Sequence, residues 1–361
     1  MEILFFLITI FFSLGQLARI TLFERQINFY IYEIFLLIVL LTLIFKFKLE
    51  PIKYFWKNFK EFFLFFLILI LSLIFNFNQF VYFQNLVGLL YFLRLFFYFV
   101  YFFYLYYFVR NHQYFKKNIQ VSLNIFIILT IISTITQFFL YPDLRNLMYL
   151  GWDPHLGRTF GVFFDTSIAA VIYGLIFFIS NNFFIKIIYL FFLIFSFSRG
   201  VILSFIFTLL YVFLKNKQSV FRLIIFIIFL IIVLILVPKP FGEGSKLTRT
   251  YTIISRINDY KEGWNLFLKK PIFGWGYNRL RYVRNIENSH AASNFSSSYL
   301  TILVSSGFLG LLSFLFLLNF FWKKFKNKRE LLILIGLTSF FDNIFLHPFI
   351  LFLFFTSLFD N

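Results

Sequence analysis

Arginine is the residue type in this chain whose placement could do chemistry. Arg158 lies in the segment HLGRTFGVFFDTS, Arg199 lies in the tripeptide Ser-Arg-Gly between two apolar runs, and Arg256 opens a segment with helical spacing. A planar guanidinium binds a phosphate through two parallel hydrogen bonds, whereas lysine binds it as a point charge. These three arginines therefore indicate a site for a phosphate-bearing ligand, and contact with lipid headgroups is the simpler alternative.

Further charged residues could contact such a ligand. Arg94 lies near the middle of the apolar run 81–108, where a charge costs about 2.5–3.5 kcal/mol on insertion scales. We expect it to face the bundle interior, a wet cavity or a partner, unless it snorkels along a tilted helix. Arg279 and Arg281 form a basic run with Arg284, and Asp165 could simply form an ion pair with Arg158.

Histidine and cysteine give no sign of a metal site. The chain has four histidines and no cysteine, and no pair of histidines has the spacing of metal ligands. We therefore expect no tightly held metal and no cofactor. His290 is the histidine best placed for catalysis, because it lies in the polar stretch 288–298 that leads into an apolar run.

Composition defines the class of protein that must position these residues. Of 361 residues, 61% are apolar, 25% are aromatic and 13% are charged, and the mean hydropathy is +0.87. A soluble chain would be nearer half apolar and a quarter charged. These values exclude a soluble enzyme, a disordered chain and a nucleic-acid-binding protein. They predict an all-α, polytopic membrane bundle.

The apolar runs predict about twelve transmembrane helices. They are 3–20, 29–45, 62–77, 81–108, 120–140, 160–179, 183–197, 199–214, 220–237, 298–320, 331–345 and 347–358. Lys and Arg in the short loops alternate in a way that places the N-terminus in the cytoplasm. Glu2 and the lack of a basic start indicate a retained first helix rather than a signal peptide.

One long loop breaks this pattern. We divide the chain into helices over 1–237, an extracytoplasmic loop over 238–297 and further helices over 298–361. The basic residues on the cytoplasmic side are 14 Lys and 3 Arg, whereas those outside are 10 Arg and 5 Lys. The spacing of apolar residues from Ser255 to Lys270 predicts an amphipathic helix on the membrane, ended by Pro271 and the glycines that follow.

A set of short motifs, in order, resembles the O-antigen ligase/polymerase superfamily of bacterial surface-polysaccharide enzymes. The resemblance covers about 145–350. Its motifs are GRxxGxF at 157–163, SRG at 198–200, SR…DYKxGW at 255–264, PIFGWGY at 271–277, SYL at 298–300, SGFLGLL at 306–312 and FFDN…HP at 340–348. Each motif alone is weak, but the order, spacing and topology together are specific.

The resemblance implies a glycosyltransferase of the bacterial cytoplasmic membrane whose active site faces outward. Its donor would be a glycan on undecaprenyl pyrophosphate, and its acceptor a lipid-linked repeat unit or lipid A core. Arg158, Arg199 and Arg256 would bind the pyrophosphate without a metal, and His290 is a further catalytic candidate. Tyr299 of the SYL motif is a candidate substrate contact, together with Arg94, Asp165, Arg279 and Arg281.

Three alternatives stay open. Ligases usually carry a His-Asn pair where this chain has Ser296 and Ser297, which favours a repeat-unit polymerase over a ligase. A flippase or transporter of the same lipid-linked substrate would explain Arg94 equally well. A scaffold whose arginines only contact lipid is the third alternative.

Overall fold

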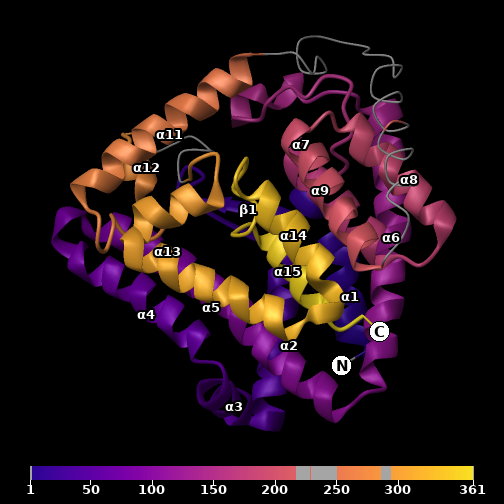
Figure 1. Cartoon of the computed structure of the whole chain (residues 1–361), viewed down its shortest axis with the longest axis horizontal. Helices are drawn as coiled ribbons and strands as arrows, with labels where there is room; N and C mark the ends of the chain where they lie inside the picture. The colour runs from indigo at the N-terminus through magenta and orange to yellow at the C-terminus, as the bar shows by residue number, and fades with distance from the viewer. Residues whose placement is uncertain (1, 217–227, 229–249, 286–293, 361) are drawn as a thin grey trace.

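Helices dominate the structure, a computed structural model that describes residues 2–216, 228, 250–285 and 294–360 (Figure 1). The predicted span 220–237 lies almost wholly outside these residues. The α-helices are α1 (Glu2–Ser13), α2 (Ile31–Phe47), α3 (Glu50–Asn58), α4 (Lys60–Phe75), α5 (Tyr82–Asn111), α6 (Phe115–Leu140), α7 (Thr166–Ile179), α8 (Phe183–Phe195), α9 (Arg199–Lys215), α11 (Tyr251–Lys269), α12 (Leu280–Val283), α13 (Ser298–Lys324), α14 (Arg329–Thr338) and α15 (Pro348–Ser357). Short 3₁₀ turns are η1 (Gly15–Ala18), η2 (Phe77–Gln79), η3 (Arg145–Leu150) and η5 (Lys326–Lys328).

The expected number of membrane spans is not reached within the described residues. Three helices, α5, α6 and α13, are long and apolar enough to cross a membrane, and α3 with α4 would make a fourth although the pair bends by 97°. Most of the other predicted spans are apolar helices of 10–17 residues. At 1.5 Å per residue such helices fall short of the ~30 Å hydrocarbon core. The turn at 196–198 falls between two predicted spans, whereas the turn at 339–347 takes up the second half of the predicted span 331–345, so that only α14 remains of it.

The all-α prediction is wrong in one small region. Residues of the expected loop after the first helix form a two-stranded antiparallel sheet of β1 (Arg19–Leu22) and β2 (Ile27–Tyr30). The connecting residues Phe23, Glu24 and Arg25 all take positive φ values. A tight hairpin usually needs glycine or asparagine for this backbone conformation, so the sequence carried no turn signal.

The predicted amphipathic helix is present as α11, although it begins at Tyr251 and not at Ser255. It ends before Pro271, as expected, and the following loop packs on a break in α13. Gly307 in that break has φ 71°, and a Cβ there would lie 2.1 Å from the Ile272 oxygen. Phe308 N donates to Pro271 O at 2.8 Å, and Gly276 N donates to Ser305 O at 2.8 Å. Two motifs of the resemblance thus pack on each other and fix α11 above α13.

Aromatic side chains build most of the core. Phenylalanines of α4, α5, α13 and α15 contact one another in one continuous cluster. Phe102 of α5, for example, lies 4.9 Å from Phe355 of α15 and 5.5 Å from Phe321 of α13, measured between ring centroids. Figure 1 shows α14 and α15 surrounded by the other helices, with α11 along one edge of the molecule.

Candidate active site

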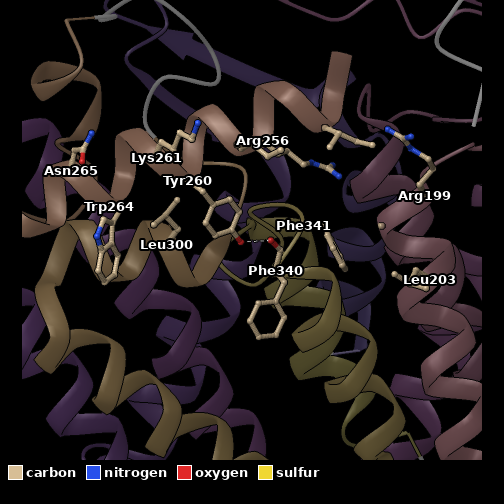
Figure 2. Close-up of a pocket in the computed structure, with 13 residues that line it drawn as sticks. Arg199, Leu203, Arg256, Tyr260, Lys261, Trp264, Asn265, Leu300, Phe340 and Phe341 are labelled. Atoms are coloured by element: carbon tan, nitrogen blue, oxygen red, sulfur yellow. Dashed lines mark hydrogen bonds between the residues drawn. The ribbon is translucent and has the colours of Figure 1, made fainter. Parts of the chain in front are cut away.

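A cavity of about 1110 Å³ lies between α9, α11, the start of α13 and the turn that follows α14 (Figure 2). Its wall is mostly apolar, with two arginines on one side. The lining residues are Arg199, Gly200 and Leu203 of α9; Ile253, Arg256, Ile257, Tyr260, Lys261, Trp264 and Asn265 of α11; Leu300 of α13; and Phe340 and Phe341 of the turn. Such a wall suits a ligand with an apolar chain and an anionic group.

Arg199 and Arg256 reach this cavity from different helices. The Ser-Arg-Gly motif predicts a turn at 198–200; the turn lies at 196–198 instead, and Arg199 is the first residue of α9. Figure 2 shows the Arg256 side chain extending from α11 toward the end of α9 that carries Arg199. The cavity therefore presents two guanidinium groups, one from each of these helices, on the same side of its wall.

Asp342 connects Arg256 to the turn between α14 and α15. Its Oδ2 atom accepts a hydrogen bond from Arg256 Nη2 at 3.1 Å, and each of the two side chains is 30% exposed. Burial raises the pKa of Asp342 to about 6, although the neighbouring Arg256 guanidinium acts in the opposite direction. This carboxylate is ionised at neutral pH and can still accept a proton.

Arg158 and Asp165 lie behind this pair rather than in the lining of the cavity. Arg158 is buried, and its Nε donates to Ser196 O at 2.7 Å, in the turn just before Arg199. Asp165 caps α7 by accepting from the backbone N–H groups of Ser167 and Ile168, at 2.7 and 3.0 Å. The charges of both residues act on Asp342. Arg158 and Arg256 thus act on the carboxylate of Asp342, and Arg199 lies near Arg256.

Arg94 lies elsewhere, as part of an ion pair inside the bundle. Its Nε and Nη2 donate to the two carboxylate oxygens of Glu33 at 2.7 and 2.8 Å, and its Nη1 donates to Asn28 O at 2.9 Å. Tyr98 donates its hydroxyl to the same carboxylate. Of the sequence-based alternatives, the structure shows the partnered arginine, and Arg94 also lines two smaller cavities of about 100 and 290 Å³.

Arg279 and Arg281 are also distant from the cavity, because they attach the loop after α11 to the rest of the bundle. Arg279 is 2% exposed; its Nη1 donates to Leu73 O at 3.0 Å, and its guanidinium lies 5.0 Å from the Phe80 ring centroid. Arg281 Nη1 lies 3.5 Å from Gln26 O, in the loop between β1 and β2. Their positions indicate a structural role in this structure.

Tyr299 and His290 are the two remaining predicted site residues. Tyr299 lies one residue before the lining residue Leu300, donates its hydroxyl to Gly336 O at 3.1 Å and packs on Phe340 with the ring centroids 4.4 Å apart. It supports the floor of the cavity. His290 lies outside the described residues.

Ser296 and Ser297, which stand where ligases usually carry a His-Asn pair, are both engaged in local structure. The Ser296 backbone and hydroxyl donate to Asp259 Oδ2, and Asp259 also pairs with Arg284 at 3.2 Å. Ser297 caps α13 and donates its hydroxyl to Ser339 O at 3.0 Å.

Sequence reasoning missed Asp342 and the aromatic residues of the α11 wall. Asp342 was part of the FFDN motif but had no assigned role, although a charge inside the apolar run 331–345 is the same kind of signal that singled out Arg94. Tyr260 and Trp264 were assigned to the membrane-facing side of a helix, yet both line the cavity, and Tyr260 donates to Phe340 O at 2.6 Å. Within the described part of the chain, no three side chains of the usual metal-ligand types gather.

These features define a membrane protein of apolar helices with an arginine-lined cavity beneath an amphipathic helix. Residues 184–315 match the protein-family model Wzy_C, described as O-antigen ligase. The matched part contributes Arg199 and Arg256, and it is similar to the ligase- and polymerase-type membrane enzymes of surface-polysaccharide biosynthesis. The resemblance predicted from the motifs is confirmed for these residues. A search of curated proteins finds no match.

Proposed function

We propose that this protein is a membrane glycosyltransferase that polymerises oligosaccharide repeat units carried on undecaprenyl pyrophosphate. The observation that carries the proposal is the pair Arg199 and Arg256 at one mostly apolar cavity, within the residues that match the O-antigen ligase family. The apolar wall suits a polyprenyl chain, and the two guanidinium groups suit its pyrophosphate. In this proposal the cavity opens on the outer face of the bacterial cytoplasmic membrane.

The reaction follows from this arrangement. A hydroxyl of the acceptor glycan attacks the anomeric carbon of the donor glycan, and the bond between that carbon and the pyrophosphate oxygen breaks. The bonding electrons leave with the lipid pyrophosphate, and Arg199 and Arg256 stabilise the negative charge that develops there. The proton of the attacking hydroxyl passes to a base, for which we propose Asp342. The arginines take the place of a catalytic metal ion.

Polymerase is favoured over ligase because Ser296 and Ser297 replace the His-Asn pair and serve local structure. A polymerase transfers the growing glycan to another lipid-linked unit, and a ligase transfers it to lipid A core. The acceptor therefore decides between the two activities.

The test uses the purified full chain in nanodiscs with a synthetic undecaprenyl-pyrophosphate oligosaccharide, a chelator and no nucleotide sugar. We expect a ladder of glycan lengths on a gel. Arg199→Lys keeps the charge but loses the two-pronged guanidinium, so it should lower the rate at least tenfold. Arg145→Lys is the matched control, because Arg145 is 67% exposed, pairs with Asp143 and lies outside the cavity. A single product on added lipid A core and no ladder would make the protein a ligase.

The two remaining alternatives predict different results with the same variant. A transporter should move the lipid-linked glycan across a vesicle membrane and form no glycosidic bond. A scaffold should keep its function with Lys at position 199. A ladder that persists unchanged in Arg199→Lys would contradict the proposed role of the cavity.

A further inference from the structure

A second large cavity lies on the other side of the segment 158–165. Its volume is about 830 Å³, and it is bounded by α1, η1, the β1–β2 hairpin, α6 and η3. Apolar side chains that line it are exposed to the surroundings, with Leu17 at 64%, Ile132 at 55% and Leu140 at 78%. α6 is long and apolar enough to cross a membrane, and in a bilayer this side of the cavity would face the lipid chains.

Two arginines give this cavity a cationic end. The Arg19 guanidinium lies 4.9 Å from the ring centroid of Trp152, and its Nη1 atom is buried without a hydrogen-bond partner. Arg25 Nη1 donates to Tyr149 O at 3.3 Å, and the Arg25 side chain also lines the cavity. Among the described residues, no carboxylate lies within ion-pair distance of either arginine.

A buried guanidinium nitrogen without a partner loses its hydration and gains nothing in return. Such an atom is explained if an anionic group completes its hydrogen bonds. The hairpin holds both arginines at one end of a mostly apolar space, and this combination of an apolar chain site and two positive charges fits an anionic lipid.

One segment of the chain lies between this cavity and the first one. Gln137, which lines the second cavity, accepts hydrogen bonds from the backbone N–H groups of Phe160 and Gly161, each at 3.0 Å. Arg158, at the start of the same segment, bonds to Ser196 beside Arg199, and its charge acts on Asp342. A ligand in either cavity would therefore contact residues close to the same short segment.

We propose that the second cavity binds the polyprenyl diphosphate of a second lipid-linked glycan, the acceptor, with Arg19 and Arg25 on its phosphates. This inference rests on the proposed polymerase function, in which donor and acceptor are both lipid-linked and must be held together. Two arginines match the two phosphates of the diphosphate. An ordinary anionic phospholipid is the competing occupant.

Photo-crosslinking tests the site without requiring turnover. The full chain in nanodiscs of phosphatidylethanolamine is treated with a polyprenyl diphosphate that carries a diazirine in its chain, and labelled peptides are mapped by mass spectrometry. We expect label in α6 or η3 and, separately, in α9 or α11. The double variant Arg19→Gln/Arg25→Gln should lose at least nine-tenths of the α6 and η3 label and keep the rest. Arg145 is an exposed arginine of η3, and Arg145→Gln is therefore the matched control.

A second variant guards against misfolding of the hairpin. Ile132→Trp leaves both arginines in place but fills the exposed side of the cavity, so it should also remove the α6 label. Label that is unchanged in both variants, or that a tenfold excess of phosphatidylglycerol displaces as well as unlabelled polyprenyl diphosphate does, would overturn the proposal.

Kinetics then separate the acceptor role from the donor role. When a short donor and a chain-blocked acceptor are varied independently, Arg19→Gln/Arg25→Gln should raise the KM for the acceptor at least tenfold and leave the KM for the donor unchanged. An equal effect on both substrates would contradict the acceptor role. If the protein makes no polymer, the proposed function fails, while the labelling still decides whether the second cavity binds a polyprenyl diphosphate.

Discussion

Arg256 and Asp342 form an ion pair of 3.1 Å between two parts of the chain that are 86 residues apart. Arg256 belongs to α11, which lies over the cavity, and Asp342 belongs to the turn between α14 and α15. The pair therefore connects the amphipathic helix to the interior helices at the place where we expect the chemistry. It also orients the Arg256 guanidinium toward the end of α9 that carries Arg199.

Asp342 predicts a specific dependence of activity on pH. Because burial raises its pKa to about 6, the carboxylate becomes ionised as the pH rises through that value, and only the ionised form accepts a proton. The polymerisation rate should therefore rise with pH to a plateau above about 7. Asp342→Asn should lower the plateau at least a hundredfold and remove this limb from the pH profile.

Stability should change with pH in the opposite direction. The folded protein binds the proton of Asp342 more tightly than the unfolded chain, whose carboxyl has the ordinary pKa of 3.8. The contribution of this group to stability is therefore present at low pH and is lost as the pH rises from about 4 to about 6. Thermal unfolding in detergent should show this loss in the wild type and less of it in Asp342→Asn. If the polymerisation rate depends on pH in the same way in the wild type and in Asp342→Asn, Asp342 is excluded as the base.

Gly200 should control the position of the turn that carries Asp342. A Cβ at Gly200 would lie 2.8 Å from the Cβ of Phe341, so Gly200→Ala must displace the turn backbone or α9. We expect at least a tenfold loss of polymerisation with only a small fall in melting temperature. Gly174→Ala is the control, because its added Cβ would lie 2.7 Å from the mobile end of Leu334. Equal activity losses in the two variants would contradict a positioning role for Gly200.

Gly307 is the residue at which α13 breaks to receive the loop after α11. With φ 71° and ψ −172° it has a backbone conformation that is essentially restricted to glycine, and a Cβ would overlap the Ile272 carbonyl. Gly307→Ala should destabilise the protein by about 3 kcal/mol, from backbone strain and the displaced loop. Gly336→Ala is the matched helical control, because its nearest contact would be 3.5 Å. Melting curves that show equal stability for both variants would contradict this account of the break.

The long helices and the turn at Arg199 could be predicted from the sequence because their signals are local. Apolar runs of sufficient length identified α5, α6 and α13, and Arg199 with Gly200 marked the turn before α9. An apolar run does not show where a short helix ends, because not every break is marked by a proline or a charge. The turn 339–347, for example, begins well inside the predicted span 331–345.

The contacts of the site depend on distant parts of the chain, which periodicity does not reveal. Arg158, Arg199 and Arg256 could be selected by residue type and by their place near apolar runs. The pairing of Arg256 with Asp342 could not be predicted, because no spacing relates residue 342 to α11. The hairpin that carries Arg19 was also missed, since its turn uses non-glycine residues with positive φ.

Arg94 and Glu33 provide the last prediction, which separates a structural arginine from a substrate-binding one. Their side chains are 18% and 10% exposed, and two hydrogen bonds of 2.7 and 2.8 Å join them. Glu33→Gln would leave the guanidinium charge uncompensated, so it should destabilise the protein by about 3 kcal/mol.

The double variant Glu33→Gln/Arg94→Met removes both charges and should recover most of that loss, as measured by melting in the same detergent. It should also polymerise at close to the wild-type rate, because neither residue lies at the first cavity. A stable double variant that has lost activity would instead assign Arg94 to the substrate, and would favour a substrate path through the bundle between α2 and α5.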